Sequence, residues 1–172
     1  MTNDTKEAPL QRILEARRIL QAVCDPEIPA LTIEDLGVLR DIHWLVDSET
    51  LEVVITPTYS GCPAMNTIEM NIRAELENAG FERVKVSTVL SPAWTTDWLT
   101  KTGRQKLQAF GIAPPAEASL DKKALFGETR ALQCPHCGSV NTQMISQFGS
   151  TACKALFRCL DCLEPFDYFK CH

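Results

Sequence analysis

Hydrophobic residues recur at helical spacing near the start of the chain. Pro9 suits the first position of a helix, where its missing N–H costs nothing, and Pro26 disfavours helical geometry at Asp25. The sequence therefore predicts a helix that begins at Pro9 and ends by Asp25, after a polar segment over residues 1–7 that we expect to fray. The residues expected near the apolar face of this helix are Leu10, Ile13, Leu14, Leu20, Val23 and Cys24.

A second helix and three strands follow. Residues 42–46 and 51–56 read as two strands joined by the polar turn 47–50, and residues 84–90 alternate as a third strand. Between them, Pro63 fits the start of a helix and Gly80 its end. Its apolar positions are Met65, Ile68, Ile72, Leu76 and Ala79. We interpret His43 as an ordinary strand residue on the solvent face.

The loop over residues 25–37 contains two prolines and four carboxylates. Thr32 and Asp35 predict a short helical turn with its own cap, closed by Gly37. Composition alone slightly favours a solvated acidic loop with capping roles. The four acidic residues are Asp25, Glu27, Glu34 and Asp35.

Cys62 stands between Gly61 and Pro63, at or beside the N-cap of the second helix. The free N–H groups and the helix dipole favour a thiolate at such a position, so we expect a lowered pKa and raised reactivity. The alternative is that Cys62 is a small buried cap residue. The flanking glycine, which permits close backbone approach, favours a functional cysteine.

We expect the segment after the third strand to contribute to hydrophobic packing rather than to a ligand pocket. Residues 91–94 break the strand, and we expect Trp94, Trp98 and Leu99 to form an apolar cluster. Thr96 or Thr102 is available as the cap of a last short helix that closes at residue 111. Residues 112–130, which include two adjacent prolines, are typical of a linker.

The tail carries the strongest motif, two Cys-x-x-Cys turns at Cys134/Cys137 and Cys159/Cys162. Two residues between thiols let both sulfurs point at one centre, and two such turns predict a tetrahedral zinc site with Zn–S distances of about 2.3 Å. A tail of about 40 residues rarely folds on its own core. Zinc binding, at about 10–16 kcal/mol, would supply the missing folding free energy. A redox dithiol or a set of disulfides is the weaker interpretation.

Three further donors in the tail, Cys153, Cys171 and His172, are left over from this set. We favour buried or supporting roles for them over a second, labile metal site. The hairpin over 142–148 would then offer a partner protein a strand edge or an aromatic surface. The aromatic residues expected on that surface are Phe148, Phe157, Phe166, Tyr168 and Phe169.

Composition narrows the class of protein. A chain of 172 residues with 45% hydrophobic and 23% charged residues is typical of one ordinary globular domain plus a small module. The net charge of −5 argues against general nucleic-acid binding. We find no apolar span of membrane length and no signal peptide, so we expect the eight cysteines to lie in a reducing cytoplasm.

Several motifs together carry a family resemblance. The small iron–sulfur-assembly domain of SufT-like proteins is resembled by four motifs together: Asp25-Pro26-Glu27, Leu36-Gly37, Thr58 with Gly61-Cys62-Pro63, and Ser91-Pro92-Ala93-Trp94. With the tail motifs at 134–137, 149–154 and 164–171 added, the whole chain from residue 10 to 172 is similar to the D subunits of bacterial phenylacetyl-CoA epoxidases.

The resemblance implies an α+β fold. A two-layer first domain over 1–111, with about three strands and helices, would be followed by a linker over 112–130 and a zinc ribbon over 131–172. It also implies a non-catalytic accessory protein of phenylacetate degradation. Such a protein contacts the components of a multicomponent oxygenase and helps to assemble its iron centre.

The residues agree with that role. Iron handling needs a soft thiolate, hard carboxylates and an open coordination sphere. Cys62 facing Asp25 and Glu27 would supply these for transient iron or an iron–sulfur cluster, if the two loops meet. The alternatives are a zinc-ribbon nucleic-acid binder, for which the basic residues are few and scattered, and a thiol enzyme using Cys62, which lacks an evident base. A homodimer is left open.

Overall fold

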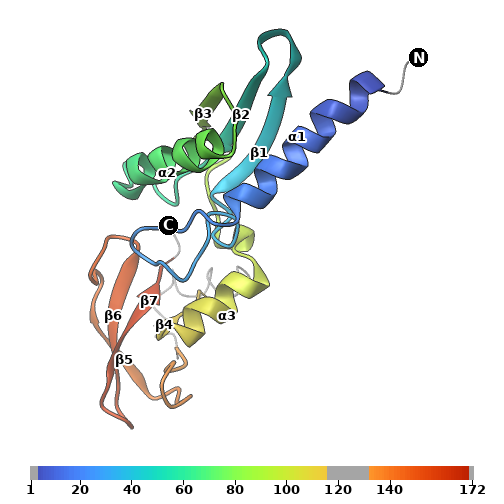
Figure 1. The fold of residues 1–172 in the computed structure, drawn as a ribbon. Helices are drawn as coiled ribbons and strands as arrows, with labels where there is room; N and C mark the ends of the chain where they lie inside the picture. Colours follow the sequence, from blue (N-terminus) through green and yellow to red (C-terminus); the bar gives the residue numbers. More distant parts are fainter. Residues whose placement is uncertain (1–3, 116–131, 171–172) are drawn as a thin grey trace. The chain divides into compact units, whose positions relative to one another are not determined.

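The computed structural model describes residues 4–115 and 132–170. The chain divides into two compact units, residues 1–94 and residues 95–172. Figure 1 shows the elements of both units. Among the described residues, no helix combines the length and the apolar character needed to cross a membrane.

The N-terminal unit is built around a three-stranded sheet. Its helices are α1 (Asp4–Leu20) and α2 (Ala64–Asn78), and its strands are β1 (Leu39–Leu45), β2 (Thr50–Ile55) and β3 (Val84–Thr88). The strand order is β1-β2-β3, with β1 antiparallel and β3 parallel to β2. Because parallel neighbours need a crossover connection, α2 links β2 to β3.

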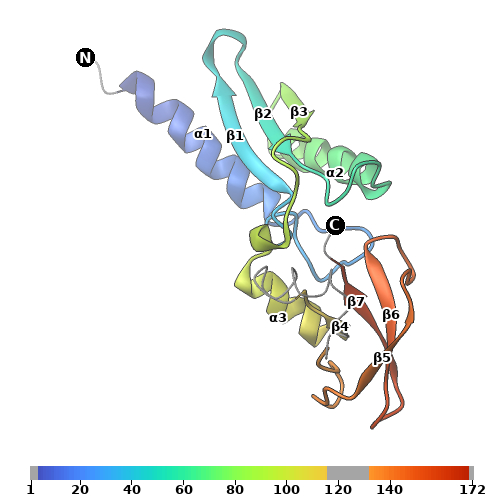
Figure 2. The same ribbon diagram turned by 180° about the vertical axis from the view of Figure 1, so that it is seen from behind.

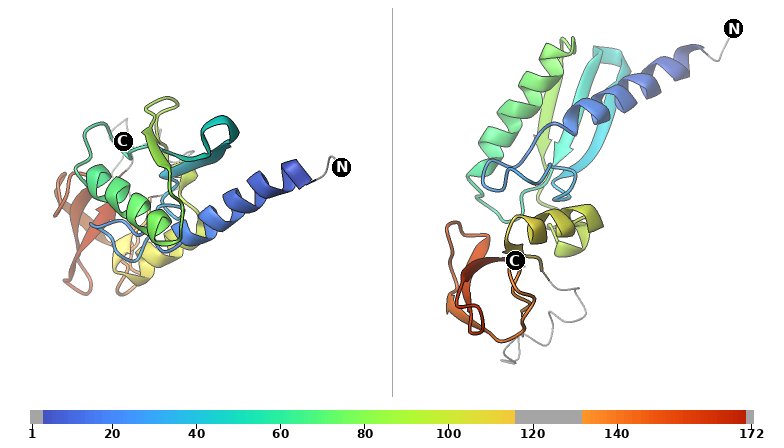
Figure 3. Two further views of the ribbon diagram at one scale, coloured as in Figure 1. Left: turned by 45° about the horizontal axis from the view of Figure 1, so that its top comes forward. Right: turned by 60° about the horizontal axis from the view of Figure 1, so that its bottom comes forward.

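Both helices of this unit lie side by side against one face of the sheet (Figure 3). On the central strand β2, Leu51, Val53 and Ile55 are fully buried and alternate with half-buried residues. This alternation buries one face of the sheet under α1 and α2. The predicted two-layer α+β architecture is therefore confirmed.

The opposite face of the sheet carries no described helix of this unit (Figure 2). A row of polar residues crosses it, since His43 pairs with Glu52 and Glu52 with Lys85 in the strand register. The Lys85 ammonium lies 2.8 Å from the Glu52 carboxylate, and hydrogen bonds from Lys85 and Ser87 lower the pKa of Glu52. His43 is half exposed, as expected for a solvent-facing strand residue.

Helix α1 differs from the prediction in its first residue and in the side that it buries. It begins at Asp4, so Pro9 lies inside it and the helix loses one backbone hydrogen bond there. Leu10 and Leu14 are more than half exposed. The buried stripe instead runs through Ala16, Leu20 and the following Val23, because α1 turns this side toward the sheet.

The loop after α1 is part of the core. Asp25 Oδ1 accepts hydrogen bonds from the N–H groups of Glu27 and Ile28, both at 2.8 Å. Thr32 and Asp35 cap each other, and Gly37 closes the turn at a φ of 67°. The capping roles are confirmed, but the solvated loop is wrong, because its apolar residues are buried. These are Ile28, Leu31, Ile33 and Leu36.

Trp94 closes the N-terminal unit. Its side chain is buried, and its Nε1–H donates to the carbonyl of Leu36 at 2.9 Å. This bond ties the end of the unit to the loop after α1. The burial of Trp94 agrees with the packing role that we expect for it from the sequence.

The C-terminal unit contains α3 (Lys101–Ala109) and a four-stranded sheet. The strands are β4 (Ile112–Ala113), β5 (Thr142–Ser146), β6 (Lys154–Cys159) and β7 (Pro165–Phe169), in the order β4-β7-β6-β5. A short 3-10 helix, Thr96–Trp98, precedes α3. The cap of α3 is Thr100, whose hydroxyl accepts from the N–H of Gly103, and neither Thr96 nor Thr102 caps it.

This division places the boundary earlier than residue 111. Helix α3 belongs to the C-terminal unit, and β4 pairs with β7, so residues 112 and 113 belong to the ribbon sheet rather than to a linker. A pairing between residues so far apart in the chain leaves no local sequence signal. Residues 116–130 of the predicted linker lie outside the described residues.

The core of the C-terminal unit joins aromatic residues to cysteines. Phe157 stacks on Phe166 and meets Tyr168 edge-on, with ring centres 5.9 and 5.8 Å apart. Cys134 and Cys159 belong to the same buried cluster. Of the aromatic residues predicted to face a partner, only Phe148 is exposed. Phe157, Phe166 and Tyr168 are buried because they supply this core, and Phe169 is buried as well.

We expect the stability of the N-terminal unit to depend on the α2 face that packs on the sheet. Ile72 is fully buried there, and Ile72→Ala is expected to destabilise the unit by about 2–5 kcal/mol. Met70→Ala, on the exposed side of the same helix, should change stability by less than about 0.5 kcal/mol. Urea unfolding followed by tryptophan fluorescence measures both, and equal effects would contradict this packing.

Candidate metal centre and the Cys62 loop

Two similar turns bring the tail cysteines together. The first carries Cys134 and Cys137 ahead of β5, and the second runs from Cys159 at the end of β6 to Cys162. After each turn the backbone takes a left-handed conformation, at Gly138 with φ 78° and at Leu163 with φ 67°. Glycine adopts this conformation freely and leucine does not. The similar backbone at a leucine shows that the geometry of the second turn is imposed by the site.

The sulfurs of these four cysteines all lie within 4.8 Å of one another. Cys137 Sγ is 3.6 Å from Cys159 Sγ, and Cys134 Sγ is 3.8 Å from Cys162 Sγ. A zinc ion bound to four thiolates at about 2.3 Å separates its sulfurs by about 3.8 Å. Both the spacing and the soft, all-sulfur donor set fit a structural zinc ion.

The electrostatics of the cluster also favour a bound cation. The N–H of Cys162 donates to Cys159 Sγ at 3.5 Å and lowers the pKa of Cys159 to about 7. The N–H of Glu164 likewise lowers the pKa of Cys162, but desolvation and the neighbouring thiols outweigh it and raise that pKa to about 12. Cys159 and Cys162 therefore do not ionise together by themselves. A divalent ion would supply the charge that replaces their protons.

A polar network outside the cysteines joins the two turns. The Asp161 carboxylate, inside the second turn, accepts from the Ser139 hydroxyl and, at 2.8 Å, from the Asn141 side-chain amide. The N–H of Leu160 donates to the Asn141 carbonyl at 2.8 Å. This network was not predicted from the sequence. Its only sequence signal is three short polar residues within or just after the cysteine turns.

Cys62 lies immediately before α2. Its N–H donates to the Tyr59 carbonyl at 3.2 Å, and its carbonyl accepts from the N–H of Met65 at 3.3 Å. The helix itself starts at Ala64, with Pro63 as its cap. Gly61 has a φ of 87°, and a Cβ built there would meet no atom within 4 Å. The neighbouring Cys62 thiol is half-buried.

The predicted low pKa of Cys62 is wrong. Desolvation raises the pKa of the thiol above its ordinary value, and the negative charges of Glu27 and Asp25 raise it further. Hydrogen bonds from the N–H of Ala64 and from the Tyr59 side chain act in the opposite direction and are outweighed. The helix terminus does favour the thiolate, but burial and two carboxylates together favour the thiol.

The charges of Asp25 and Glu27 act on the Cys62 thiol, so both carboxylates of the loop after α1 lie within electrostatic range of it. They do not close a cage around it. In the described part of the chain, the tail cysteines form the one group of three or more donors at ligand distances. Asp25 Oδ1 is also engaged with two backbone N–H groups. The Cys62 arrangement is therefore open.

The remaining tail donors do not form a second centre within the described residues. Cys153 is buried at the start of β6, with the Thr151 hydroxyl 3.0 Å from its sulfur. This burial agrees with the packing role favoured for it. Cys171 and His172 lie outside the described residues.

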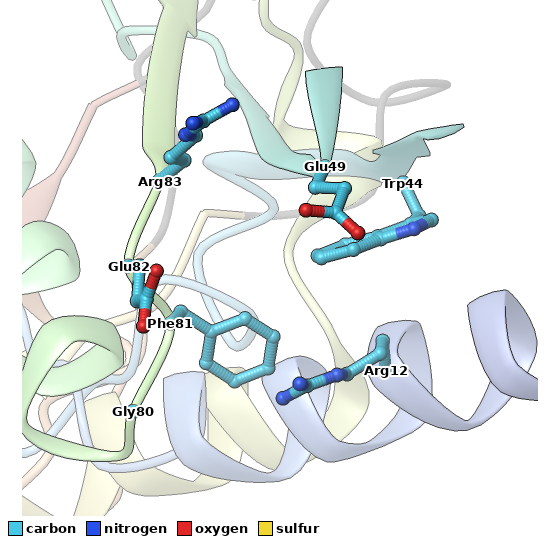
Figure 4. Close-up of a pocket in the computed structure, with 7 residues that line it drawn as sticks. All are labelled: Arg12, Trp44, Glu49, Gly80, Phe81, Glu82 and Arg83. Atoms are coloured by element: carbon cyan, nitrogen blue, oxygen red, sulfur yellow. The ribbon is translucent and has the colours of Figure 1, made fainter. Parts of the chain in front are cut away.

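A pocket of about 230 Å³ lies in the N-terminal unit (Figure 4). The Arg12 side chain from α1 lies near the rings of Trp44 and Phe81, and its guanidinium carbon is 5.8 and 5.3 Å from their centres. Arg83 lies on another wall, and its guanidinium donates to the Ser48 carbonyl at 2.9 Å. The two guanidinium groups of the pocket therefore contact aromatic rings and a backbone carbonyl. We interpret it as a packing feature.

Comparison with known proteins relates both units to described families. Residues 13–88 match the model described as iron–sulfur cluster assembly protein, and residues 118–170 match the PaaD zinc beta ribbon domain. The chain is 49% identical over 164 residues to the D subunit of the Escherichia coli K12 protein named "Putative 1,2-phenylacetyl-CoA epoxidase", covering 95% of each chain. The chain belongs to the family of phenylacetyl-CoA epoxidase D subunits. The family resemblance seen in the sequence is thus confirmed.

A solved structure shares the fold. The crystal structure titled as a domain of unknown function, DUF59, from Bacillus anthracis superposes with a TM-score of 0.54 at 22% identity, covering 59% of this chain and 96% of that one. At this identity the likeness concerns the fold alone. In this chain, the segment that matches the zinc ribbon domain contains all four cysteines of the cluster.

We expect Asp161 to control how firmly the protein keeps zinc. Asp161→Ala removes both acceptor oxygens of the network, and retention of zinc should weaken by about 10–100-fold. Release of zinc to a chromogenic chelator measures this. Glu164→Ala, which removes the same charge from the same turn, is the control and should release zinc at the parental rate. Identical rates for the two variants would contradict a role for the network.

The raised pKa of Cys62 predicts slow alkylation at neutral pH. Its rate of reaction with iodoacetamide, followed by peptide mass spectrometry, should rise at a higher pH than in a synthetic peptide of residues 58–66. Glu27→Gln removes a negative charge and should move the midpoint to lower pH. A midpoint below that of the peptide would show that the helix terminus dominates after all.

Proposed function

We propose that this chain is an accessory or maturation protein of the phenylacetyl-CoA epoxidase system in aerobic phenylacetate degradation. It would help to assemble or deliver an iron or iron–sulfur centre to the multicomponent oxygenase, and not catalyse the oxygenation itself. The observation that carries this proposal is that Cys62 lies within electrostatic range of Asp25 and Glu27, without a closed set of donors around it among the described residues. All three residues lie within the segment matched by the iron–sulfur cluster assembly model.

The charges around Cys62 suit a cargo that is held briefly. Glu27 and Asp25 raise the affinity of the sulfur for a proton. The same two carboxylates attract an iron cation, which then displaces the thiol proton. Proton and iron therefore compete for one sulfur. Because the described residues place no closed donor set around Cys62, the remaining positions stay available to a donor or a client protein.

The C-terminal unit has a different part in this proposal. We assign Cys134, Cys137, Cys159 and Cys162 as the ligands of a structural zinc ion, held in a closed set of four sulfurs. Such a site stabilises the ribbon and leaves no position for substrate. The ribbon would therefore serve to present surface to protein components of the oxygenase.

The alternatives find less support. The raised pKa of Cys62 leaves little thiolate at neutral pH, which disfavours a thiol enzyme. A net charge of −5 disfavours nucleic acid as the partner. We place the protein in the cytoplasm, where its eight cysteines would stay reduced. Both the cytoplasmic location and the choice of protein partners belong to this proposal.

Co-expression with the oxygenase components tests the role of Cys62. Cys62→Ser should lower the iron content of the purified oxygenase, and its epoxidase activity, by about tenfold or more. The physical reason is that the serine hydroxyl does not replace a soft thiolate ligand. Iron is measured by mass spectrometry and activity by consumption of the CoA thioester.

Cys24→Ser is the matched control, because Cys24 is another half-buried cysteine of the same unit. It should leave iron content and activity unchanged. Full activity with Cys62→Ser would remove Cys62 from the mechanism. Equal losses in both variants would indicate a general effect on folding and would also count against the proposal.

A further inference from the structure

A groove of about 540 Å³ lies on the C-terminal unit, apart from the four-cysteine cluster. It runs between the end of α3 and the strands β6 and β7. Its apolar walls include Phe110 and Phe148, which are 55% and 65% exposed. Two exposed aromatic side chains in the lining of one groove are typical of a surface that binds a partner.

A buried cation lies in this groove. The side chain of Lys154 is only 7% exposed, and lysine is rarely buried unless it is paired. Among the residues that the structure describes, its ammonium has one carboxylate partner, Asp167, at 3.6 Å. That distance is too long for a hydrogen bond, while an ammonium carries three donors. The Lys154 charge is therefore only partly compensated.

The surroundings of the groove add positive charge. The Lys170 ammonium lies 4.3 Å from the centre of the Phe148 ring and donates to the Gln147 carbonyl at 2.7 Å. Lys154 and Lys170 thus outnumber Asp167 here, on a chain whose net charge is −5. An acidic ligand would be attracted to this groove and repelled by the rest of the surface.

We propose that this groove binds an acidic segment of a partner protein, in which a carboxylate side chain stands beside aromatic or other large apolar side chains. The carboxylate pairs with Lys154, and the apolar side chains pack between Phe110 and Phe148. The open form of the groove between these walls suits a polypeptide segment. This docking site does not involve Cys62, so its test is independent of the test of the iron-handling role.

Two model peptides test the proposal on the zinc-loaded full chain. Acetyl-GFDFG-amide carries the carboxylate between aromatic residues, and acetyl-GFNFG-amide differs only in its neutral side chain. In NMR titrations of ¹⁵N-labelled protein, the acidic peptide should shift the amide signals of residues 149–154 and 166–167. It should bind at least fivefold more tightly than the neutral peptide.

Variants separate the cation from the apolar walls. Lys154→Met keeps the length of the side chain and should abolish the preference for the acidic peptide. Arg158→Met, which removes an exposed cation of the same strand that does not line the groove, should preserve it. Phe148→Ala should weaken both peptides by a similar factor. Asp167→Asn removes the competing carboxylate and should tighten binding of the acidic peptide.

The last variant keeps the test decisive if Lys154→Met does not fold. Equal binding of the two peptides to the unmodified protein would overturn the proposal. Shifts confined to residues outside the groove would overturn it too, and so would unchanged or weaker binding of the acidic peptide to Asp167→Asn.

Discussion

The convergence of four cysteine sulfurs is the constraint on which the C-terminal unit depends. Cys134 and Cys159 are at once candidate metal ligands and members of the buried cluster around Phe157 and Tyr168. The metal site and the hydrophobic core are therefore one structure. Without a cation, Cys159 and Cys162 hold their protons at different pKa values. The positive charge of a bound ion would hold the two turns together and thereby keep the core closed.

The N-terminal unit arranges the same kinds of donor differently. Cys62 lies within electrostatic range of the carboxylates of Asp25 and Glu27, but one carboxylate oxygen already caps its own loop and the described residues close no cage. A closed set of four sulfurs suits a permanently bound ion. An open thiol, for which a proton competes with the metal, suits an ion that is bound only transiently. In the proposed function, the two units thus divide permanent and transient metal binding between them.

Local chemistry made much of the architecture predictable. The α2 helix, the hairpin of β1 and β2 and the Thr32–Asp35 turn follow from spacing, from proline and glycine positions and from caps, all of which act between near neighbours. Helix α1 shows the limit of such reasoning. Its apolar residues lie on more than one side, and the side that is buried was decided by the sheet, so Leu10 and Leu14 are left exposed.

By itself, the sequence determined the element types, the paired cysteine turns and the family, because each of these is written in short-range spacing or in residue identity. Tertiary structure decided what depends on distance through space. It joined β4 to β7 across the chain, and it brought Asp161 of the second cysteine turn to Ser139 and Asn141 after the first. It also raised the pKa of Cys62, where burial and the two carboxylates outweigh the helix terminus that the sequence alone reveals. Electrostatic energies depend on every charge nearby, and only the fold brings those charges together.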